Sequence, residues 1–474
     1  MSTKRLLAPL AMRGRFSARV IVPADGTEPD WIVLLLPTAI AIRVFSAEGS
    51  LLIIGFFLAA AYIRRFDAKF QLNAGPLVLL FLSCAIVFSR PAGIGPLLNL
   101  LLVFALVVRL VTTVDARRII ASLIDGCGLY LFANVCFYAA GLQSPSTDFR
   151  LGGLVESTGF VRIVYPLTSS INSPPIIAAV YIASSIFLIR QPGSVRRSFR
   201  LMFFVAAIIV LVGSGSRGAL ASAVALSLLV LCLPVVTRWL VQATTLLAAV
   251  SALVLPSIIV SIQFIVTPLM SLAPGRISDA RSIATLESRE YVWDHSIRYW
   301  NDWVNDVPHL LFGYGVNGQY RSGASFSYSE ALASLIRHSE LAYVHNSFLQ
   351  QVFDGGVIGW LLFVLATYWA GTRFARRRRD WGVTAIVAMA VLLLGAMTEA
   401  TMAPGVAQES FWVFLVLVGI ACQASGTRAV DGSSERQDAT TSQDLKDSAS
   451  AELKRTLTPV RAGDVRATTR QGRD

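Results

Sequence analysis

Residues 95–113, GPLLNLLLVFALVVRLVTT, carry a single charged side chain, Arg109, in a run that is otherwise almost entirely apolar. About 20 such residues in a helix cross the hydrocarbon core of a bilayer, where a helix satisfies its own backbone hydrogen bonds. The run therefore predicts a transmembrane helix. Runs of the same kind recur along the chain, at residues 30–46, 49–64, 74–90, 95–113, 118–141, 172–190, 200–214, 217–236, 239–266, 345–371, 382–400 and 407–424.

These runs predict an all-α, polytopic membrane protein of about twelve transmembrane helices. The first two runs are short, and Arg43 lies inside the first, so the pair could form one broken unit and lower the count by one. Composition points the same way, because only 15% of the 474 residues are charged and 54% are hydrophobic. Soluble domains carry about 25% charged residues, and the mean hydropathy here is +0.61.

The formal net charge of +12 does not indicate a nucleic-acid partner. No basic helix, zinc finger or aromatic RNA-binding motif accompanies the charge, and basic residues of a membrane protein collect in its cytoplasmic loops. The five cysteines lie in or beside apolar runs, and none is spaced from another Cys or His as zinc ligands are. We therefore expect a lipid bilayer around the chain, no nucleic acid, no metal and no cofactor.

Basic residues in the short loops predict the orientation of the chain. Loops on one side are rich in Lys and Arg while the opposite loops are poor, which places the basic loops and both termini in the cytoplasm. The first span is then expected to be retained as a signal anchor. The basic positions are Lys4, Arg5, Arg13, Arg15, Arg19, Arg64, Arg65, Lys69, Arg109, Arg117, Arg118, Arg190, Arg196, Arg197, Arg200, Arg238, Arg376, Arg377, Arg378 and Arg379.

This topology divides the chain into five parts. The expected order is a basic cytoplasmic leader, nine transmembrane helices, a large extracytoplasmic loop, three further helices, and a polar tail that we expect to be disordered. Their bounds are 1–29, 30–266, 267–344, 345–424 and 425–474. A second, shorter extracytoplasmic segment is expected at about 142–171.

The large loop contains one helix with an aromatic face. Trp293, Ile297, Trp300 and Val304 recur at helical spacing. Aromatic-rich amphipathic helices favour the membrane interface, but the same face would also pack inside a small folded cap. The sequence leaves both alternatives open.

His345 and Asn346 open a predicted span at its extracytoplasmic end. A helix N-terminus carries partial positive charge and unpaired N–H groups, so it disfavours an imidazolium ion. The sequence thus predicts a neutral His345, as a general base requires. The alternative is an ordinary polar residue at the start of a helix.

Arginines at the same face form a second set of candidates. Arg217 follows a Gly-Ser-Gly-Ser turn between two spans, and Arg289 heads the aromatic helix. Glycines allow close approach of a ligand, and a guanidinium forms a bidentate fork with phosphate oxygens. Arg217 could equally be a snorkelling turn residue, and Arg289 could pair with a neighbouring glutamate. Arg150 is a weaker candidate in the shorter segment.

Together these residues favour transfer from a diphosphate-linked donor. Arginines would neutralise the leaving diphosphate in place of a metal, and His345 would take the proton from an acceptor hydroxyl. The chain contains no Asp-x-Asp pair, which argues against a carboxylate-chelated metal.

The run from His345 to Gly359 resembles a motif of the bacterial O-antigen ligase and polymerase superfamily: His-Asn, nine residues, then Gly-x-x-Gly. Ser216-Arg217-Gly218, Arg289 with Trp293, and Leu311-Phe312-Gly313-Tyr314-Gly315 support the resemblance. The resemblance implies a GT-C-like glycosyltransferase of the inner (plasma) membrane. Its implied donor is an undecaprenyl-diphosphate-linked glycan, and its acceptor a glycan, lipid or protein.

The resemblance further implies a metal-independent, inverting transfer, with His345 catalytic and Arg217 and Arg289 at the diphosphate. Arg150, with Gly153 and Asn172, resembles a looser family feature, and Asn346 is a second weaker substrate-binding candidate. We favour a polymerase, because nothing in the sequence indicates the specific terminal acceptor of a ligase. The remaining alternatives are a ligase, a transporter or flippase for lipid-linked sugars, and a non-catalytic partner in polysaccharide assembly.

Overall fold

A computed structural model describes most of the first 423 residues. The described ranges are 29–64, 70–90, 94–145, 163–168, 170–189, 194–233, 235–254, 289–333, 338–377, 381–406 and 408–423. The chain divides into two units, 1–424 and 425–474. The predicted leader up to residue 28 and the predicted tail lie outside the described residues, so those two predictions remain open.

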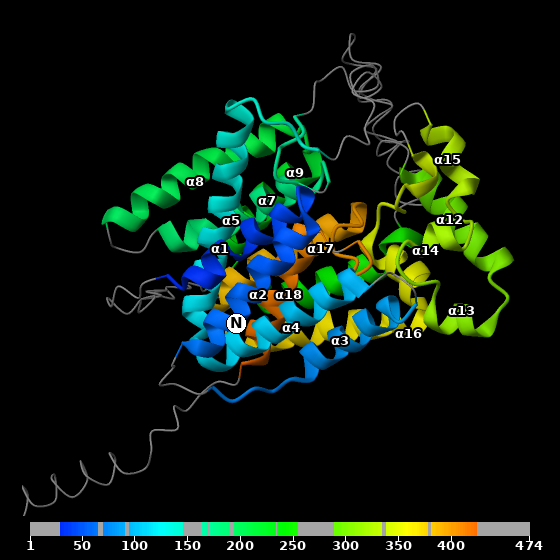
Figure 1. The fold of residues 1–474 in the computed structure, drawn as a ribbon, viewed down its shortest axis with the longest axis horizontal. Coiled ribbons are helices and arrows are strands. Elements are labelled where there is room, and N and C mark those ends of the chain that lie inside the picture. The colour runs from blue at the N-terminus through cyan, green and yellow to red at the C-terminus, as the bar shows by residue number, and fades with distance from the viewer. Residues whose placement is uncertain are drawn as a thin grey trace, which may run out of the picture. The chain divides into compact units, whose positions relative to one another are not determined.

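The described residues form helices and no β-strand, which confirms the all-helical class (Figure 1). Each predicted apolar run contains a helix. The membrane-type helices are α1 (Trp31–Ala41), α2 (Ala47–Ile63), α3 (Gly75–Phe88), α4 (Ile94–Thr113), α5 (Ala116–Ala139), α7 (Ser173–Ile189), α8 (Ser194–Gly213), α9 (Arg217–Cys232), Leu240–Val254, α16 (Ser347–Arg376), α17 (Gly382–Thr398) and α18 (Glu409–Cys422).

Three of these helices, α4, α5 and α16, are long and apolar enough to cross a membrane by length and composition. Most of the other apolar helices have only 10–17 residues, so the number of twelve spans stays a prediction. The first two runs are separate helices, because η1 (Ile42–Val44) ends α1 and Ser46 caps α2 by accepting a hydrogen bond from the Gly49 amide.

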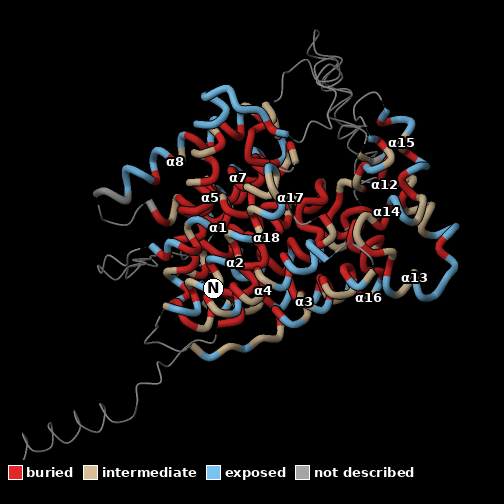
Figure 2. Tube along the Cα trace, viewed as in Figure 1, coloured by how far each residue is buried: buried red, intermediate tan, exposed pale blue. Residues whose placement is uncertain are grey.

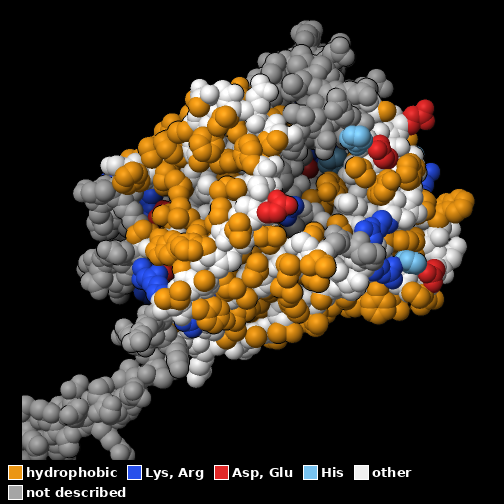
Figure 3. Space-filling view, in the orientation of Figure 1, with side chains coloured by type: hydrophobic (Ala, Val, Ile, Leu, Met, Phe, Trp, Pro, Cys, Tyr) orange, Lys and Arg blue, Asp and Glu red, His pale blue; other side chains and the backbone are white. Residues whose placement is uncertain are grey.

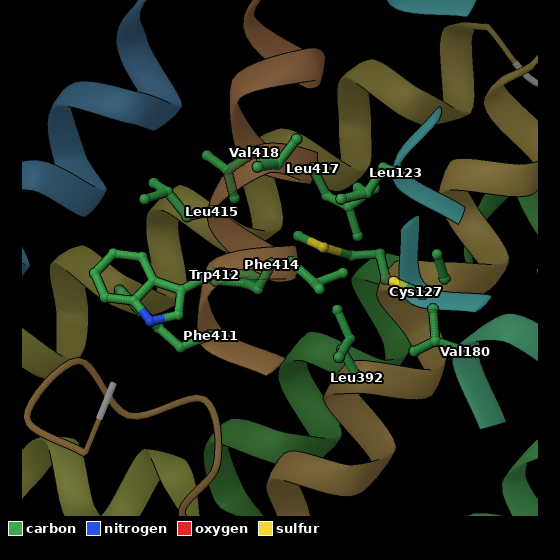
Figure 4. Packing of buried hydrophobic residues seen from close by; sticks show 14 of the residues in the cluster. Leu123, Cys127, Val180, Leu392, Phe411, Trp412, Phe414, Leu415, Leu417 and Val418 are labelled. Carbon is green, nitrogen blue, oxygen red and sulfur yellow. The ribbon is translucent and has the colours of Figure 1, made fainter. Parts of the chain in front are cut away.

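The innermost helices are α17 and α18, whose residues are nearly all buried (Figure 2). They pack against α5, α7 and α16. Figure 4 shows part of this core, which includes Phe414 of α18, Cys127 of α5, Val180 of α7 and Leu392 of α17. The centre of the helical assembly is thus filled by aliphatic and aromatic side chains.

Outer helices expose large apolar side chains. Along α8 these include Phe199, Leu201, Val205, Ile208 and Val212, each more than two-fifths exposed. Orange hydrophobic side chains also dominate the face drawn in Figure 3, where charges are few. An apolar surface of this extent is unusual for a water-soluble monomer, whereas lipid tails would solvate it well.

Arg200 corrects one detail of the predicted topology. It was expected in a cytoplasmic loop, but α8 begins at Ser194 and Arg200 lies inside that helix, 4% exposed. Its guanidinium binds both carboxylate oxygens of Asp125 on α5, at 2.8 and 3.2 Å. Burying either charge alone would be costly, and the partner offsets that cost.

The described part of the predicted outer loop forms a small folded unit. It contains α12 (Arg289–Trp303), α13 (Val307–Phe312), α14 (Gly318–Arg321), α15 (Phe326–Leu332) and η4 (Ser339–Leu341). Trp293 is fully buried, in a cluster with Tyr328, Val344 and Phe353, and Ile297 and Trp300 pack against that cluster. Protein side chains therefore cover the aromatic face, which favours the folded-cap alternative over a helix lying in the membrane interface.

Two glycines join this folded unit to α16. Gly356 interrupts α16 with φ 65° and ψ −171°, and Gly313 has φ 67° and ψ −165°. Only glycine adopts this region readily. A Cβ on either residue would overlap the backbone of the other segment. Amides of Tyr314 and Gly315 donate to the carbonyls of Phe353 and Asp354, at 2.8 and 2.9 Å, so the broken turn of α16 still has hydrogen-bond partners.

We predict that Gly356→Ala lowers the thermal midpoint of the protein in detergent. The substitution adds a strain of about 1–3 kcal/mol and an overlap with the Leu311 carbonyl. Gly55→Ala is the matched control, because Gly55 lies within α2 with open space around a new Cβ. There alanine should be neutral or stabilising by up to ~1 kcal/mol. Equal midpoints for the two variants would contradict the described junction.

Candidate active site

Asn346 fixes the start of α16. Its side-chain oxygen accepts hydrogen bonds from the amides of Phe348 and Leu349, at 3.0 and 2.9 Å. Its Nδ2 donates to Ser251 Oγ and to the Met397 carbonyl, at 2.7 and 2.8 Å. A polar side chain of this type is the usual cap of a helix N-terminus. The geometry supports a structural cap, and the substrate-binding role of Asn346 stays a prediction.

His345 precedes the cap and has a left-handed backbone, with φ 48°. Its side chain is about one-quarter exposed, at 27%, and its Nδ1 lies 3.3 Å from Glu399 Oε2. An ionised carboxylate only accepts hydrogen bonds, so Nδ1 carries the hydrogen in this contact. The lone pair of the neutral ring is then on Nε2, which is the arrangement a general base needs.

Glu399, directly after α17, is the centre of the site. Its Oε1 pairs with the Arg289 guanidinium, and its Oε2 accepts from Asn172 Nδ2 at 2.7 Å as well as facing His345. Ser347 Oγ donates to the Glu399 backbone carbonyl at 2.6 Å. One carboxylate thus joins residues from three other parts of the chain.

The pKa of Glu399 lies below its ordinary value. Burial acts to raise this pKa, but the Arg289 guanidinium, His345 and the Asn172 amide together outweigh burial. A carboxyl with a depressed pKa contributes stability above its unfolded pKa of ~4.3 and loses it as pH falls through the folded value. Glu399 is therefore ionised at neutral pH, and its contribution is lost only in acid.

Arg217 is at the first position of α9 and is exposed. The turn before it is held by Ile163, whose amide donates to the Gly213 carbonyl at 2.9 Å. The segment that begins at Ile163 reaches Glu399 through Asn172, a stretch that spans at most ~30 Å of extended chain. The segment 163–172 thus connects the Arg217 turn to the His345 centre.

The sequence-derived candidates separate into three groups. Arg289 and His345 meet at one carboxylate, that of Glu399. Arg217 is linked to them by the segment 163–172. Arg150 and Gly153 lie outside the described residues.

Sequence reasoning missed Glu399 and underrated Asn172. The available signal was an acidic residue in the last two positions of a predicted apolar run, at its predicted outer end. A charge at such a position usually faces a partner or a cavity.

Within the described ranges, no three His, Cys, Asp or Glu side chains come together as a metal site would require. The polar centre at Glu399 is built instead from one carboxylate, one imidazole and one guanidinium.

Comparison with known proteins adds independent information. Residues 202–364 match the family model described as O-antigen ligase. That stretch contains Arg217, Arg289, His345 and the Gly313–Gly356 junction, and it leaves out Asn172 and Glu399. Searches of curated proteins and of solved structures gave no match. This match over about a third of the chain supports the resemblance to the O-antigen ligase and polymerase superfamily.

Proposed function

We propose that this protein is an inner-membrane glycosyltransferase that polymerises undecaprenyl-diphosphate-linked glycans on the extracytoplasmic face. The observation that carries the proposal is the contact of His345 Nδ1 with a carboxylate that also binds Arg289. A histidine oriented by a carboxylate is a general-base arrangement. The family match supports the broader activity, and its description as O-antigen ligase makes ligation the second candidate.

In the proposed reaction, His345 Nε2 removes the proton of an acceptor hydroxyl. The hydroxyl oxygen attacks the anomeric carbon of the donor glycan while the bond from that carbon to the diphosphate oxygen breaks. Attack from the side opposite the leaving group inverts the anomeric centre. The imidazolium formed on His345 is stabilised by ionised Glu399.

The leaving undecaprenyl diphosphate gains negative charge as that bond breaks. Arg217 lies at a helix N-terminus, where amide groups and the helix dipole favour anions. Arg289 already binds Glu399, so it would contact the diphosphate by bridging the two anions with its forked guanidinium. The proposed mechanism thus requires no metal to neutralise the leaving group.

We predict that His345→Ala abolishes chain growth. Purified wild-type protein would be reconstituted with undecaprenyl-diphosphate repeat units alone, and product length would be read on a gel. Base assistance is worth ~10²–10⁴-fold, so a ladder should form with wild type and not with the variant. His338→Ala is the control, because His338 is exposed and lies near Glu340 rather than Glu399.

A ladder from His345→Ala would contradict the general-base role. No ladder from wild type would favour ligation, which is tested by adding candidate lipid, protein and glycan acceptors. Failure with every acceptor would contradict a transferase and favour a transporter of lipid-linked sugars.

We predict that Glu399→Gln lowers kcat by about 10²-fold or more. The amide keeps the size of the side chain but cannot stabilise an imidazolium as a carboxylate does. Glu340→Gln is the matched control, since Glu340 lies in the same folded unit as α12 but near His338. A kcat for Glu399→Gln within a few-fold of wild type would remove Glu399 from the proposed mechanism.

We predict that Arg217→Lys impairs transfer, because a point charge does not reproduce the bidentate fork. Arg298→Lys on α12 is the control, as Arg298 is largely exposed and pairs with Asp294 one turn away. Chelating agents should leave the wild-type rate unchanged. Wild-type rates from Arg217→Lys would reduce Arg217 to a turn residue, and loss of activity on chelation would contradict the metal-free mechanism.

A further inference from the structure

Gln350 occupies an unusual position relative to His345. In many helices an apolar residue just before the N-cap packs against an apolar residue in the second turn, and this contact sets the direction of the entering chain. In α16 these two positions are held by His345 and Gln350. Neither residue is apolar, and yet Gln350 is fully buried. A buried side-chain amide at this position requires hydrogen-bond partners.

The side-chain amide of Gln350 has three hydrogen-bond partners. Its Oε1 accepts from the backbone amide of Val344, the residue before His345, at 3.3 Å. Its Nε2 donates to Gln319 Oε1 at 2.7 Å and to Asp354 Oδ1 at 2.8 Å. A reversed amide would place its NH₂ group against the Val344 N–H, so these partners allow only one orientation. Every group of the side-chain amide is engaged.

The partners of Gln350 are themselves held in place. Asp354 Oδ1 also accepts from the Gly318 amide at 2.8 Å, and Gln319 Nε2 donates to the Leu341 carbonyl at 3.4 Å. The Val344 carbonyl accepts from Trp293 Nε1 at 2.8 Å. Val344 is therefore fixed through its N–H by Gln350 and through its carbonyl by Trp293.

His345 needs this support because its backbone is left-handed, at φ 48°. Such a conformation persists in a residue other than glycine only where its surroundings hold it. Asn346, the residue after His345, is fixed by the hydrogen bonds of its own side chain. Gln350 fixes Val344, the residue before His345. Release of either side would let the imidazole move away from Glu399.

We propose that Gln350 is a positioning residue, which acts through Val344 to hold His345 against Glu399 and which is itself oriented by Gln319 in the folded outer unit. The consequence for turnover rests on the proposed function, in which His345 is the base. The hydrogen bond by which Gln350 holds Val344 does not depend on the proposed function, and its loss can be measured without any substrate.

The test compares Gln350→Met with Gln351→Met. Gln351 is the next residue, is equally buried, and donates to Ser83 Oγ at 2.9 Å rather than to the His345 segment. Ser83 keeps its own hydrogen bond to the Gly359 carbonyl, so Gln351→Met should still fold and assemble. Methionine approximates the length of glutamine and removes its polar groups.

Hydrogen–deuterium exchange of the peptide containing Val344 is the first measurement. Gln350→Met should speed exchange there by about tenfold, as expected for loss of one hydrogen bond, and Gln351→Met should not. Kinetics are the second measurement. A misplaced base costs about 10²-fold in kcat, while the KM for the lipid-linked donor should stay within about twofold because Arg217 and Arg289 are untouched.

Unchanged exchange at Val344 in Gln350→Met would overturn the proposal whatever the activity. Faster exchange with a wild-type kcat would also overturn it, provided that His345→Ala is inactive in the same assay. An active His345→Ala would instead overturn the base role in the proposed function, and exchange would still decide whether Gln350 holds Val344. If Gln350→Met does not assemble, Gln319→Met decides: wild-type exchange and kcat there would overturn the proposal.

Discussion

One buried carboxylate organises the candidate site. Glu399 could not remain ionised in a protein interior without compensation, because burial opposes charge. Arg289, His345 and Asn172 provide that compensation, and they come from α12, the start of α16 and the start of α7. The ion pair and hydrogen bonds of the Glu399 carboxylate therefore hold the folded unit and the starts of α7 and α16 together at one point.

The bilayer explains why these contacts gather at helix ends. Inside a hydrocarbon region polar groups must find partners within the protein, and the buried Arg200 and Asp125 pair between α5 and α8. At helix ends the constraint relaxes, and there Asn346 caps α16 while the Glu399 carboxylate follows α17. The apolar core around α17 and α18 keeps these ends in place without contributing to the reaction itself.

Hydropathy alone located the helices, since an apolar run of sufficient length has few other stable states in a bilayer. It could not find Glu399, because pairing with His345 depends on tertiary contact between residues 54 positions apart. Arg200 was placed wrongly for a related reason: a buried partner on another helix lets a charge sit inside a helix. The local sequence pattern thus predicts the positions of helices well, but it predicts contacts between residues on different helices poorly.

The residues that carry the family resemblance have two different physical roles. His345 belongs to the candidate site, whereas Gly356 and Gly313 allow two backbones to approach more closely than any side chain would permit. That junction lies beside Asp354, which binds Gln350 one turn away on α16 and the Gly318 amide of the folded unit, next to Gln319. It therefore connects the packing of the folded unit with the backbone of His345 through Gln350. Gly313 and Gly356 therefore act on the candidate site through packing, because their close approach holds the folded unit against α16. The position of His345 can be no more rigid than that contact.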